Sequence, residues 1–238
     1  MLLVRISALA AMGLLACATL SGCGPAGING SVEVPAGATA EGATTINGSV
    51  NVGDGAKVGA TATVNGGVRI GENVTAESAK TVNGGIHIGN GTRISRDVDT
   101  VNGGIRLNSS HVGGGITTYN GDIEVGRGSR VEGGITVERP EFSNDLTKNI
   151  PRVVIGPDSV VQGTLKFHRE VKLFVNDTAK IGPVEGATPQ LYSGDDTNNP
   201  SASTAAPPTD AATAAADAPA PAPAEKPAQK PAAGGPEK

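Results

Sequence analysis

The sequence predicts an all-β fold, a single-stranded parallel β-helix (β-solenoid). The dipeptide Asn-Gly recurs at intervals of 18, 18, 18, 19 and 18 residues, which indicates coils of about 18 residues stacked on one another. Apolar and polar residues alternate within each interval, as in short strands with one buried face. Aromatic residues make up 2% of the chain and Trp is absent, so an ordinary globular core would lack its largest components. The six asparagines are Asn29, Asn47, Asn65, Asn83, Asn102 and Asn120.

The 238 residues divide into four predicted segments. Residues 1–22 have the charge and apolar run of a signal peptide, and residues 23–138 carry the solenoid repeats. Residues 139–187 are expected to form an irregular loop and then capping coils of the same domain. Residues 188–238 are rich in Pro and Ala and are predicted to be a disordered tail, because they cannot bury enough apolar surface to fold.

Apolar residues occupy fixed positions relative to each Asn, and we expect these positions to form the core. They are the residue before Asn, the third residue after it and the fifth residue after it. The first set is Ile28, Ile46, Val64, Val82, Val101 and Tyr119. A poorer column lies eleven residues after Asn at Val58, Ala76, Ile94 and Val131, and a further one is suggested by Ala62, Val98, Ile116 and Ile135. Three strands per coil predict a triangular cross-section, with six coils marked by the Asn-Gly pairs.

The Asn-Gly pairs suit corners between strands, because Asn tolerates left-handed backbone angles and Gly has no Cβ. Stacked Asn side chains can also form an amide ladder along the axis. The alternative is a row of Asn side chains that contacts a ligand. The single 19-residue step predicts a corner or bulge near Asp97 to Thr100, since an extra residue within a strand would reverse every following side chain.

The period breaks at Arg139 and coil-like sequence returns after Pro151. All three phenylalanines lie in this part of the chain: Phe142, Phe167 and Phe174. We expect them to cover the last coil, because the end of a stack needs larger side chains over its open core.

The segment Leu20-Ser21-Gly22-Cys23 resembles the lipobox of bacterial lipoproteins. The resemblance implies that Cys23 is diacylated, becomes the mature N-terminus and attaches the chain to a membrane. Gly24 stands where an Asp favours retention in the inner membrane in that family, so the outer membrane, facing the periplasm, is expected. The alternative is an ordinary secreted protein with an incidental cysteine.

Charge and motifs exclude several classes of function. Removal of the leader leaves 18 basic and 23 acidic residues, a net charge of −5, so nucleic acid is not an expected partner. No pair of carboxylates, nucleotide-binding loop or calcium-binding repeat stands out from the pattern. We expect no enzymatic activity, no cofactor and no metal ion.

The fourth residue after each Asn is outward-facing in the predicted coils. The set is Glu33, Asn51, Arg69, His87, Arg106 and Glu124. Stacking would place Arg69, His87 and Arg106 in one line, a candidate ligand strip for an anionic sugar or phosphate. The alternative is an ordinary solvated face with acidic ends.

The segment from Asn120 to Val137, with its Gly-Asp-Ile, Val-Gly and Val-Glu-Gly-Gly-Ile pattern, resembles bactofilins, which are polymer-forming bacterial cytoskeletal β-helices. The resemblance extends loosely from Ile28 to Ala187 and implies a structural role with self-association. Bactofilins are usually cytosolic and lack a lipobox, so the leader departs from that family. Repeat-containing adhesin domains of envelope proteins are a second resemblance.

Three functions follow as hypotheses. The first is a non-enzymatic, lipid-anchored envelope scaffold that associates with itself. The second is a glycan-binding or adhesin-like module for peptidoglycan or another envelope polysaccharide. The third is a carbohydrate-active β-helix enzyme, which would need a cluster of carboxylates.

Overall fold

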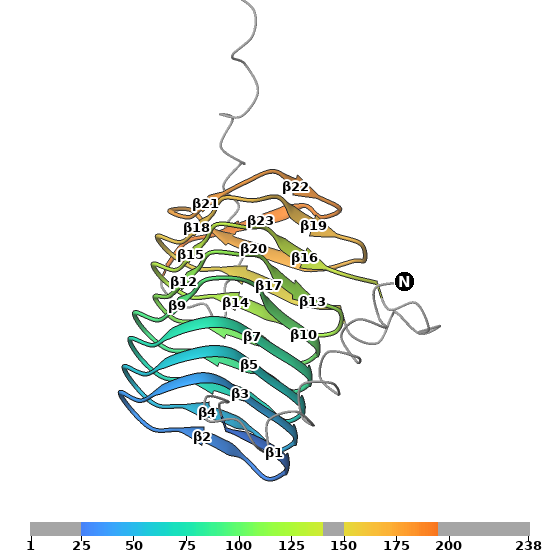
Figure 1. The fold of residues 1–238 in the computed structure, drawn as a ribbon. Coiled ribbons are helices and arrows are strands. Elements are labelled where there is room, and N and C mark those ends of the chain that lie inside the picture. Colours follow the sequence, from blue (N-terminus) through green and yellow to red (C-terminus); the bar gives the residue numbers. More distant parts are fainter. Residues whose placement is uncertain (1–24, 140–149, 195–238) are drawn as a thin grey trace, which may run out of the picture. The chain divides into compact units, whose positions relative to one another are not determined.

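The structure is a computed structural model that describes residues 25–139 and 150–194. The predicted fold class is confirmed: these residues contain strands but no helix, and all strand pairs are parallel. The strands wind into a β-solenoid of about nine turns, in which residues roughly 18 apart are in register. Figure 1 shows the coils stacked in sequence order from the N-terminal strands in blue to the C-terminal strands in orange.

The first face of the solenoid is a sheet of nine strands, one from each coil. Its strands in order are β2 (Val32–Val34), β4 (Val50–Val52), β6 (Val68–Ile70), β8 (Ile86–Ile88), β11 (Ile105–Leu107), β14 (Ile123–Val125), β17 (Arg152–Ile155), β20 (Lys172–Asn176) and β23 (Pro189–Tyr192). Nine coils replace the six that the Asn-Gly pairs mark, because the coils beyond Asn120 lack that dipeptide.

The second and third faces belong to one sheet of 14 strands. In the first coils, single long strands bend around the corner and serve both faces: β3 (Thr39–Asn47), β5 (Lys57–Asn65) and β7 (Thr75–Asn83). The second face continues as β9 (Arg93–Ile94), β12 (His111–Val112), β15 (Arg130–Val131), β18 (Val160–Val161) and β21 (Lys180–Ile181). The third face contains β1 (Ala26–Asn29), β10 (Val98–Asn102), β13 (Ile116–Thr118), β16 (Ile135–Val137), β19 (Leu165–Phe167) and β22 (Val184–Glu185).

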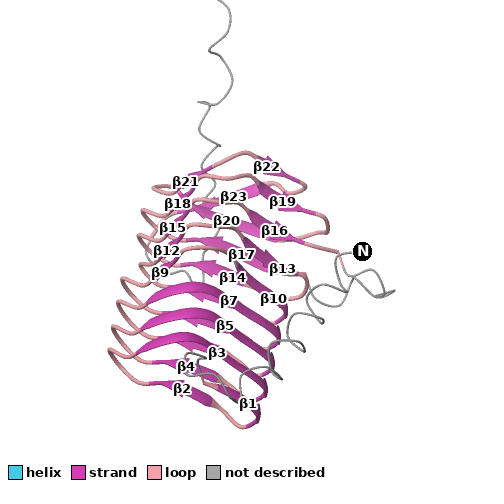
Figure 2. Ribbon diagram, viewed as in Figure 1, coloured by secondary structure: helices cyan, strands magenta, loops and turns pink. Residues whose placement is uncertain are grey.

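The extra residue of the 19-residue step lies at the corner between β9 and β10. Ala76 and Ala79 of β7 pair with Ile94 and Val98, so the corner gains one residue between Ile94 and Val98. The prediction placed it near Asp97 to Thr100, and the observed corner, residues 95–97, overlaps that range at its first residue. The extra residue ends the bent strand and divides it into two short strands joined by a loop, as Figure 2 shows.

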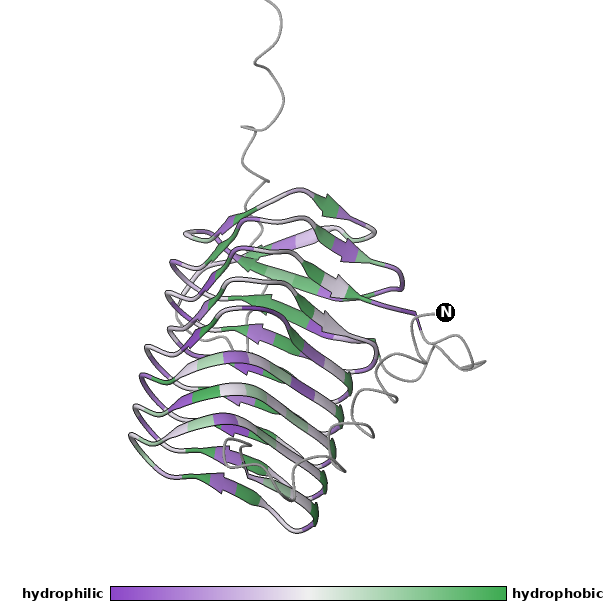
Figure 3. Cartoon of the chain, in the orientation of Figure 1, coloured by the Kyte–Doolittle hydropathy of each residue, from purple (hydrophilic) through white to green (hydrophobic). Residues whose placement is uncertain are grey.

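The interior is filled by the alternating residues of the three faces. Residues three and five after each Asn are buried in all six repeats, as predicted, and the first and third residues of β8, for example, are no more than 1% exposed. The column of Val58, Ala76, Ile94 and Val131 is also buried, and Val112, ten residues after Asn102, joins it in register with Ile94. In many of the strands hydrophobic and hydrophilic residues alternate, as Figure 3 shows, which reflects a single buried side, whereas β17 has the uninterrupted apolar run Val153–Ile155.

Two predicted core positions are wrong. The residue before each Asn lies on the outer surface of the third face, because the buried residue is the Thr one position earlier; in β5, Thr63 is buried and Val64 is partly exposed. Ala62 is likewise outward, since the residue in register with buried Ala79 is Thr61. Both errors have the same physical origin: Thr61 and Thr63 are buried although they are polar, so the inward side of the strand is offset by one residue from its aliphatic residues.

The glycine after each Asn from Asn47 to Asn120 is required by the stacking of the coils. A Cβ on Gly66 would lie 2.1 Å from the carbonyl oxygen of Gly48, and one on Gly84 would lie 2.1 Å from that of Gly66. The same conflict recurs at Gly48, Gly103 and Gly121. These corners therefore exclude a side chain because successive backbones are in direct contact.

The C-terminal end differs from the predicted phenylalanine cap. Phe167 belongs to the interior of the eighth coil, whereas Phe174 faces outward under the guanidinium of Arg152, 5.4 Å from the ring centroid. The aromatic residue buried in the last coil is Tyr192, whose hydroxyl donates to the backbone carbonyl of Ile155 at 3.2 Å. The strands continue to Tyr192 and not only to residue 187.

Several predicted features lie outside the described residues. They are the signal peptide, the lipidation residue Cys23, Phe142 and the Pro/Ala-rich tail from residue 195 onward. Within the part of the chain that the structure describes, there is no helix long and apolar enough to cross a membrane.

Candidate functional site

The candidate ligand strip is a continuous column on the first face. Arg69 of β6, His87 of β8 and Arg106 of β11 are direct partners in the parallel ladder, so their side chains follow one another along the axis. The column runs from Glu33 through Asn51 to these three residues and ends at Glu124. Each alternates with two buried neighbours, and the side chains of Arg69, His87 and Arg106 are exposed. The structure therefore brings the predicted residues together.

The positive charge of this strip is not uniform. Arg106 Nε donates to Glu124 Oε2 at 2.6 Å, and the two side chains are 48% and 16% exposed. This ion pair neutralises the C-terminal end of the strip. Arg69 and His87 form no hydrogen bond or ion pair with any described residue, so they are the two groups of the strip available to a ligand.

The neighbouring charges act on His87. Partial burial lowers the pKa of His87 from its usual value of 6.5, the guanidinium groups of Arg106 and Arg69 lower it further, and Glu124 opposes them by raising it. The ring is therefore neutral at pH 7. An anion bound beside His87 would offset the repulsion between the protonated ring and the two guanidinium groups, and it would favour protonation of the ring.

A shallow groove of about 340 Å³ lies beside the strip. Its walls include Asn51, Arg69 and His87 on the first face, and its far side is the corner formed by Gly53, Gly71 and Gly89. One cation, one imidazole and an amide in an open groove can hold an extended anionic ligand, but they do not supply the two opposed carboxylates of a glycosidase.

The six asparagines form an amide ladder on the outer corner. The Nδ2 of each Asn from Asn47 to Asn120 donates to the Oδ1 of the Asn one coil earlier, at 2.8–3.2 Å. The amides bind one another, so this row is a contact between coils and has little capacity left for a ligand.

Arg169 terminates this ladder. Its Nη1 donates to Asn120 Oδ1 at 2.6 Å and to the backbone carbonyl of Tyr119 at 3.1 Å. Thr118, Val137 and Phe167 are in register on successive strands. Asn120 is two residues after Thr118 and Arg169 is two residues after Phe167, so Arg169 occupies the position that corresponds to Asn120 two coils later. The sequence reasoning missed this residue, because the period is broken between residues 139 and 151.

A second row of contacts, also missed, runs inside the same corner. Buried Thr45, Thr63, Thr81 and Thr100 each donate from Oγ1 to the carbonyl of the glycine at the Asn-Gly corner one coil earlier, at 2.8–3.1 Å. The signal was present in the sequence, since a Thr precedes each Asn by two residues from Thr45 to Thr118. The hydroxyl of Thr118 is buried and has no hydrogen-bond partner among the residues that the structure describes.

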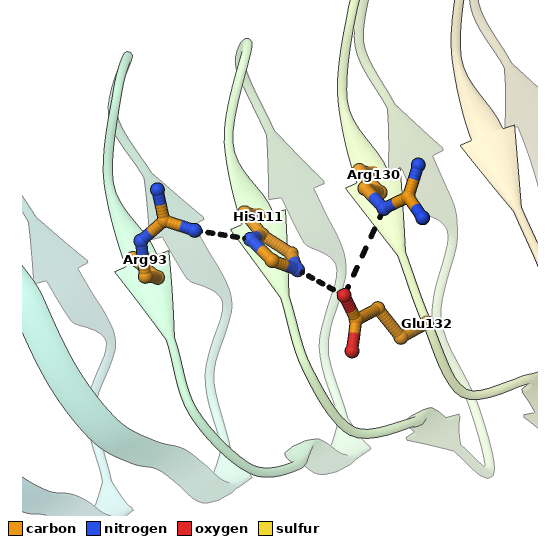
Figure 4. A network of polar contacts seen from close by, with 4 residues as sticks. All are labelled: Arg93, His111, Arg130 and Glu132. Carbon is orange, nitrogen blue, oxygen red and sulfur yellow. Dashed lines mark hydrogen bonds and ion pairs between the residues drawn. The ribbon is translucent and has the colours of Figure 1, made fainter.

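A polar network lies on the second face, where Figure 4 shows it crossing three coils. Arg93 Nη1 lies 2.6 Å from His111 Nδ1, and His111 Nε2 lies 3.0 Å from Glu132 Oε1. Arg130 Nε is 3.8 Å from the same carboxylate oxygen. Because an arginine can only donate, His111 accepts at Nδ1 and donates from Nε2 to Glu132. Both ring nitrogens of His111 therefore have partners within the network, and the contacts connect successive coils.

Within residues 25–139 and 150–194, no group of three or more His, Cys, Asp and Glu side chains is arranged to hold a metal ion. Comparisons of the chain with protein-family models, with curated proteins and with solved structures give no match. The function must therefore be argued from the residues themselves.

Proposed function

We propose that this chain is a non-enzymatic structural protein of the bacterial envelope, attached to a membrane by lipid on Cys23 and associating with itself as a scaffold. The lipobox-like segment before Cys23 supports the lipid attachment and the proposed localisation at the outer membrane, facing the periplasm. The bactofilin-like pattern from Asn120 to Val137 supports self-association.

One observation carries the structural role: polar side chains at the surface bind the next coil along the axis. The Asn ladder, the Arg106–Glu124 pair, the Lys80–Asp99 pair and the Arg93–His111 contact each join residues 18 or 19 apart. Side chains engaged in this way stiffen the stack and are not gathered around a cavity. A rod reinforced along its axis suits a spacer or scaffold.

The ends of the stack favour contact with a second copy. Within the described residues, β2 pairs only with β4, and β23 pairs only with β20, so each end leaves one edge without a neighbouring strand. An open strand edge is a template for another chain. Because β23 begins with Pro189, which has no N–H to donate, the β2 end is the better template.

Lipid attachment is tested by growing cells with labelled palmitate and separating their membranes. The full chain should carry the label and sediment with the membranes, whereas Cys23→Ala should lose the label. A label that persists in Cys23→Ala would contradict lipidation at this residue.

Self-association is tested separately with the lipidated full chain in vesicles and a chemical cross-linker. Cross-linked dimers and larger species should form when the chain is concentrated in the vesicles and should decline by mass action as lipid is added. Monomer alone at every ratio of protein to lipid would rule out a self-associating scaffold.

The second candidate, a glycan-binding module, is favoured by the unpaired Arg69 and His87 beside the groove. The full chain should sediment with peptidoglycan or an acidic polysaccharide. Binding should weaken in Arg69→Gln and strengthen as the pH falls and His87 gains a proton. Arg130→Gln on the second face is the matched control, and equal binding by both variants would exclude the groove.

A further inference from the structure

The outer surface of the third face carries a row of apolar side chains. Ladder register places Ile28, Ile46, Val64, Val82 and Val101 one above another on five successive coils. Ile28 is 60% exposed, and among the described residues it is the one large hydrophobic side chain that is exposed. The other four are partly exposed. We call this row the apolar row.

The apolar row and the outward column beside it carry no charge over the first three coils, and the exposed Glu41 of β3 lies at the bend toward the second face. The outward neighbours on the same strands are Ala26, Thr44 and Ala62, and the first charged residues, Lys80 and Asp99, pair with each other at 2.8 Å. The other two faces already carry charge there, with Glu33 and Arg69 on the first and Lys57 on the second. The third face is therefore the least costly of the three to remove from water.

The row begins beside the proposed anchor. Ile28 is the fifth residue after Cys23, so the exposed isoleucine lies within about 17 Å of the lipidated residue even if the chain is fully extended. The end of the row that is most exposed is thus the end held at the bilayer surface.

The size of the row decides between two occupants, a second copy and a membrane. Five coils of one face offer roughly 300 Å², whereas a stable protein interface buries about 800 Å² on each partner. A second copy would therefore bind this face weakly. A bilayer is different, because the anchor makes docking intramolecular and a small apolar contact is then sufficient.

We propose that the third face, from Ile28 to Val101, lies against the lipid bilayer that holds the anchor. Ile28 enters the interface, and the neighbouring Asn ladder lies at the polar edge of the contact. The solenoid then extends along the membrane surface and presents its first and second faces, with their charged columns, away from the lipid. This inference rests on the lipidation of Cys23 in the proposed function.

The test uses the lipidated full chain in vesicles of phosphatidylethanolamine and phosphatidylglycerol, with a polarity-sensitive fluorophore on one introduced cysteine. The introduced cysteine is the only free thiol of the mature chain in this proposal, because Cys17 belongs to the leader and Cys23 carries the lipid. The probe is placed by Val64→Cys on the third face or by Lys57→Cys on the second. Both positions lie outward on β5, which makes them a matched pair.

Emission from position 64 should shift to the blue and be quenched by lipid-borne quenchers, while emission from position 57 should do neither. Equal emission at both positions would overturn the inference and leave the proposed scaffold intact. A shift at position 64 that disappears on dilution of the protein with lipid would assign the face to a second copy instead. Loss of vesicle attachment itself would count against the proposed function.

Discussion

At the scale of the residue, hydrogen bonding between coils is divided between exposed amides and buried hydroxyls. The amides of the Asn ladder are in contact with water, where exchange of partners costs little. The hydroxyls of the threonine row are buried and have no water to replace a lost partner. Stability should therefore depend more on the threonines than on the asparagines that first attract attention.

Two threonine substitutions test this difference. Thr63→Val removes a buried donor to the carbonyl of Gly48 and should cost about 1 kcal/mol of unfolding free energy, or about 2–4 °C in the melting temperature. Thr118→Val removes a hydroxyl that has no partner and should cost nothing or stabilise the protein. Thermal melts followed by circular dichroism give both values, and equal losses would show that the bond to Gly48 contributes little.

The imidazole of His87 provides a prediction about pH. Its resonance in NMR should titrate below 6.5, and Arg106→Gln should raise its pKa because one repelling charge is removed. Glu124→Gln should lower the pKa further, since it removes the attracting carboxylate and leaves Arg106 unpaired. A titration at or above 6.5 in the native protein would contradict the arrangement of the strip.

The sign of the linked stability follows from the same pKa. Between the folded value and 6.5 the unfolded chain binds more protons than the folded chain, so stability rises with pH in this window. The contribution of neutral His87 is complete above 6.5 and is lost as the pH falls through the folded value. His87→Asn should make the protein less sensitive to acid in this range.

At the scale of the element, the Asn-Gly corner is the part of the coil with the strictest requirement for glycine. Its backbones are in contact at the Asn-Gly stack, whereas the corner after the first face also contains positions with open space that need only a left-handed residue. Gly55 (φ 68°) has no atom within 4 Å of the place where a Cβ would stand, in contrast to Gly84. Gly55 and Gly84 are therefore needed at their corners for different physical reasons.

Alanine at each corner separates steric conflict from backbone strain. Gly55→Ala should cost about 1 kcal/mol because a left-handed conformation is strained for alanine. Gly84→Ala should cost about 3 kcal/mol or more, because its methyl group would overlap the carbonyl of Gly66 and separate two coils. Denaturant titrations measure both losses. A similar loss in the two variants would mean that the coils can part at this corner without penalty.

The sequence predicted much of this element and erred where chemistry is ambiguous. Val and Ile three and five residues after Asn have one reasonable location, inside the coil, and they are there. Threonine is compatible with either side of a strand, so only the structure shows that Thr63 is inward and Val64 outward. Arg69, His87 and Arg106 could be aligned from period alone, whereas the ion pair of Arg106 depends on side-chain geometry.

At the scale of the whole molecule, the interior widens from the N-terminal coils to the C-terminal coils. The inner column of the third face begins with Ala43, Thr61 and Ala79 and continues with larger residues. These are Val98, Ile116, Ile135 and Leu165. The change coincides with the added residue at the corner after Ile94, which gives the later coils room for larger side chains.

Hydrogen exchange should reveal this gradient. Because each coil contacts only its neighbours, protection should reflect local burial, and the middle coils should exchange more slowly than either end. The first three coils, with alanine and threonine in this column, should open more readily than the coils built on isoleucine and leucine. Exchange followed by mass spectrometry measures the order, and uniform protection would indicate that the stack unfolds as one unit.

The Asn ladder also gives one corner of the solenoid a net dipole along the axis. Every side-chain amide donates toward the preceding coil, so the amide dipoles add along the corner as peptide dipoles add along a helix. The negative end is the Oδ1 of Asn120, where the guanidinium of Arg169 is bound. The positive end is the Nδ2 of Asn29, which has no partner among the described residues and lies in the first coil. An anionic group, such as a phosphate, is therefore favoured beside Asn29 in the first coil.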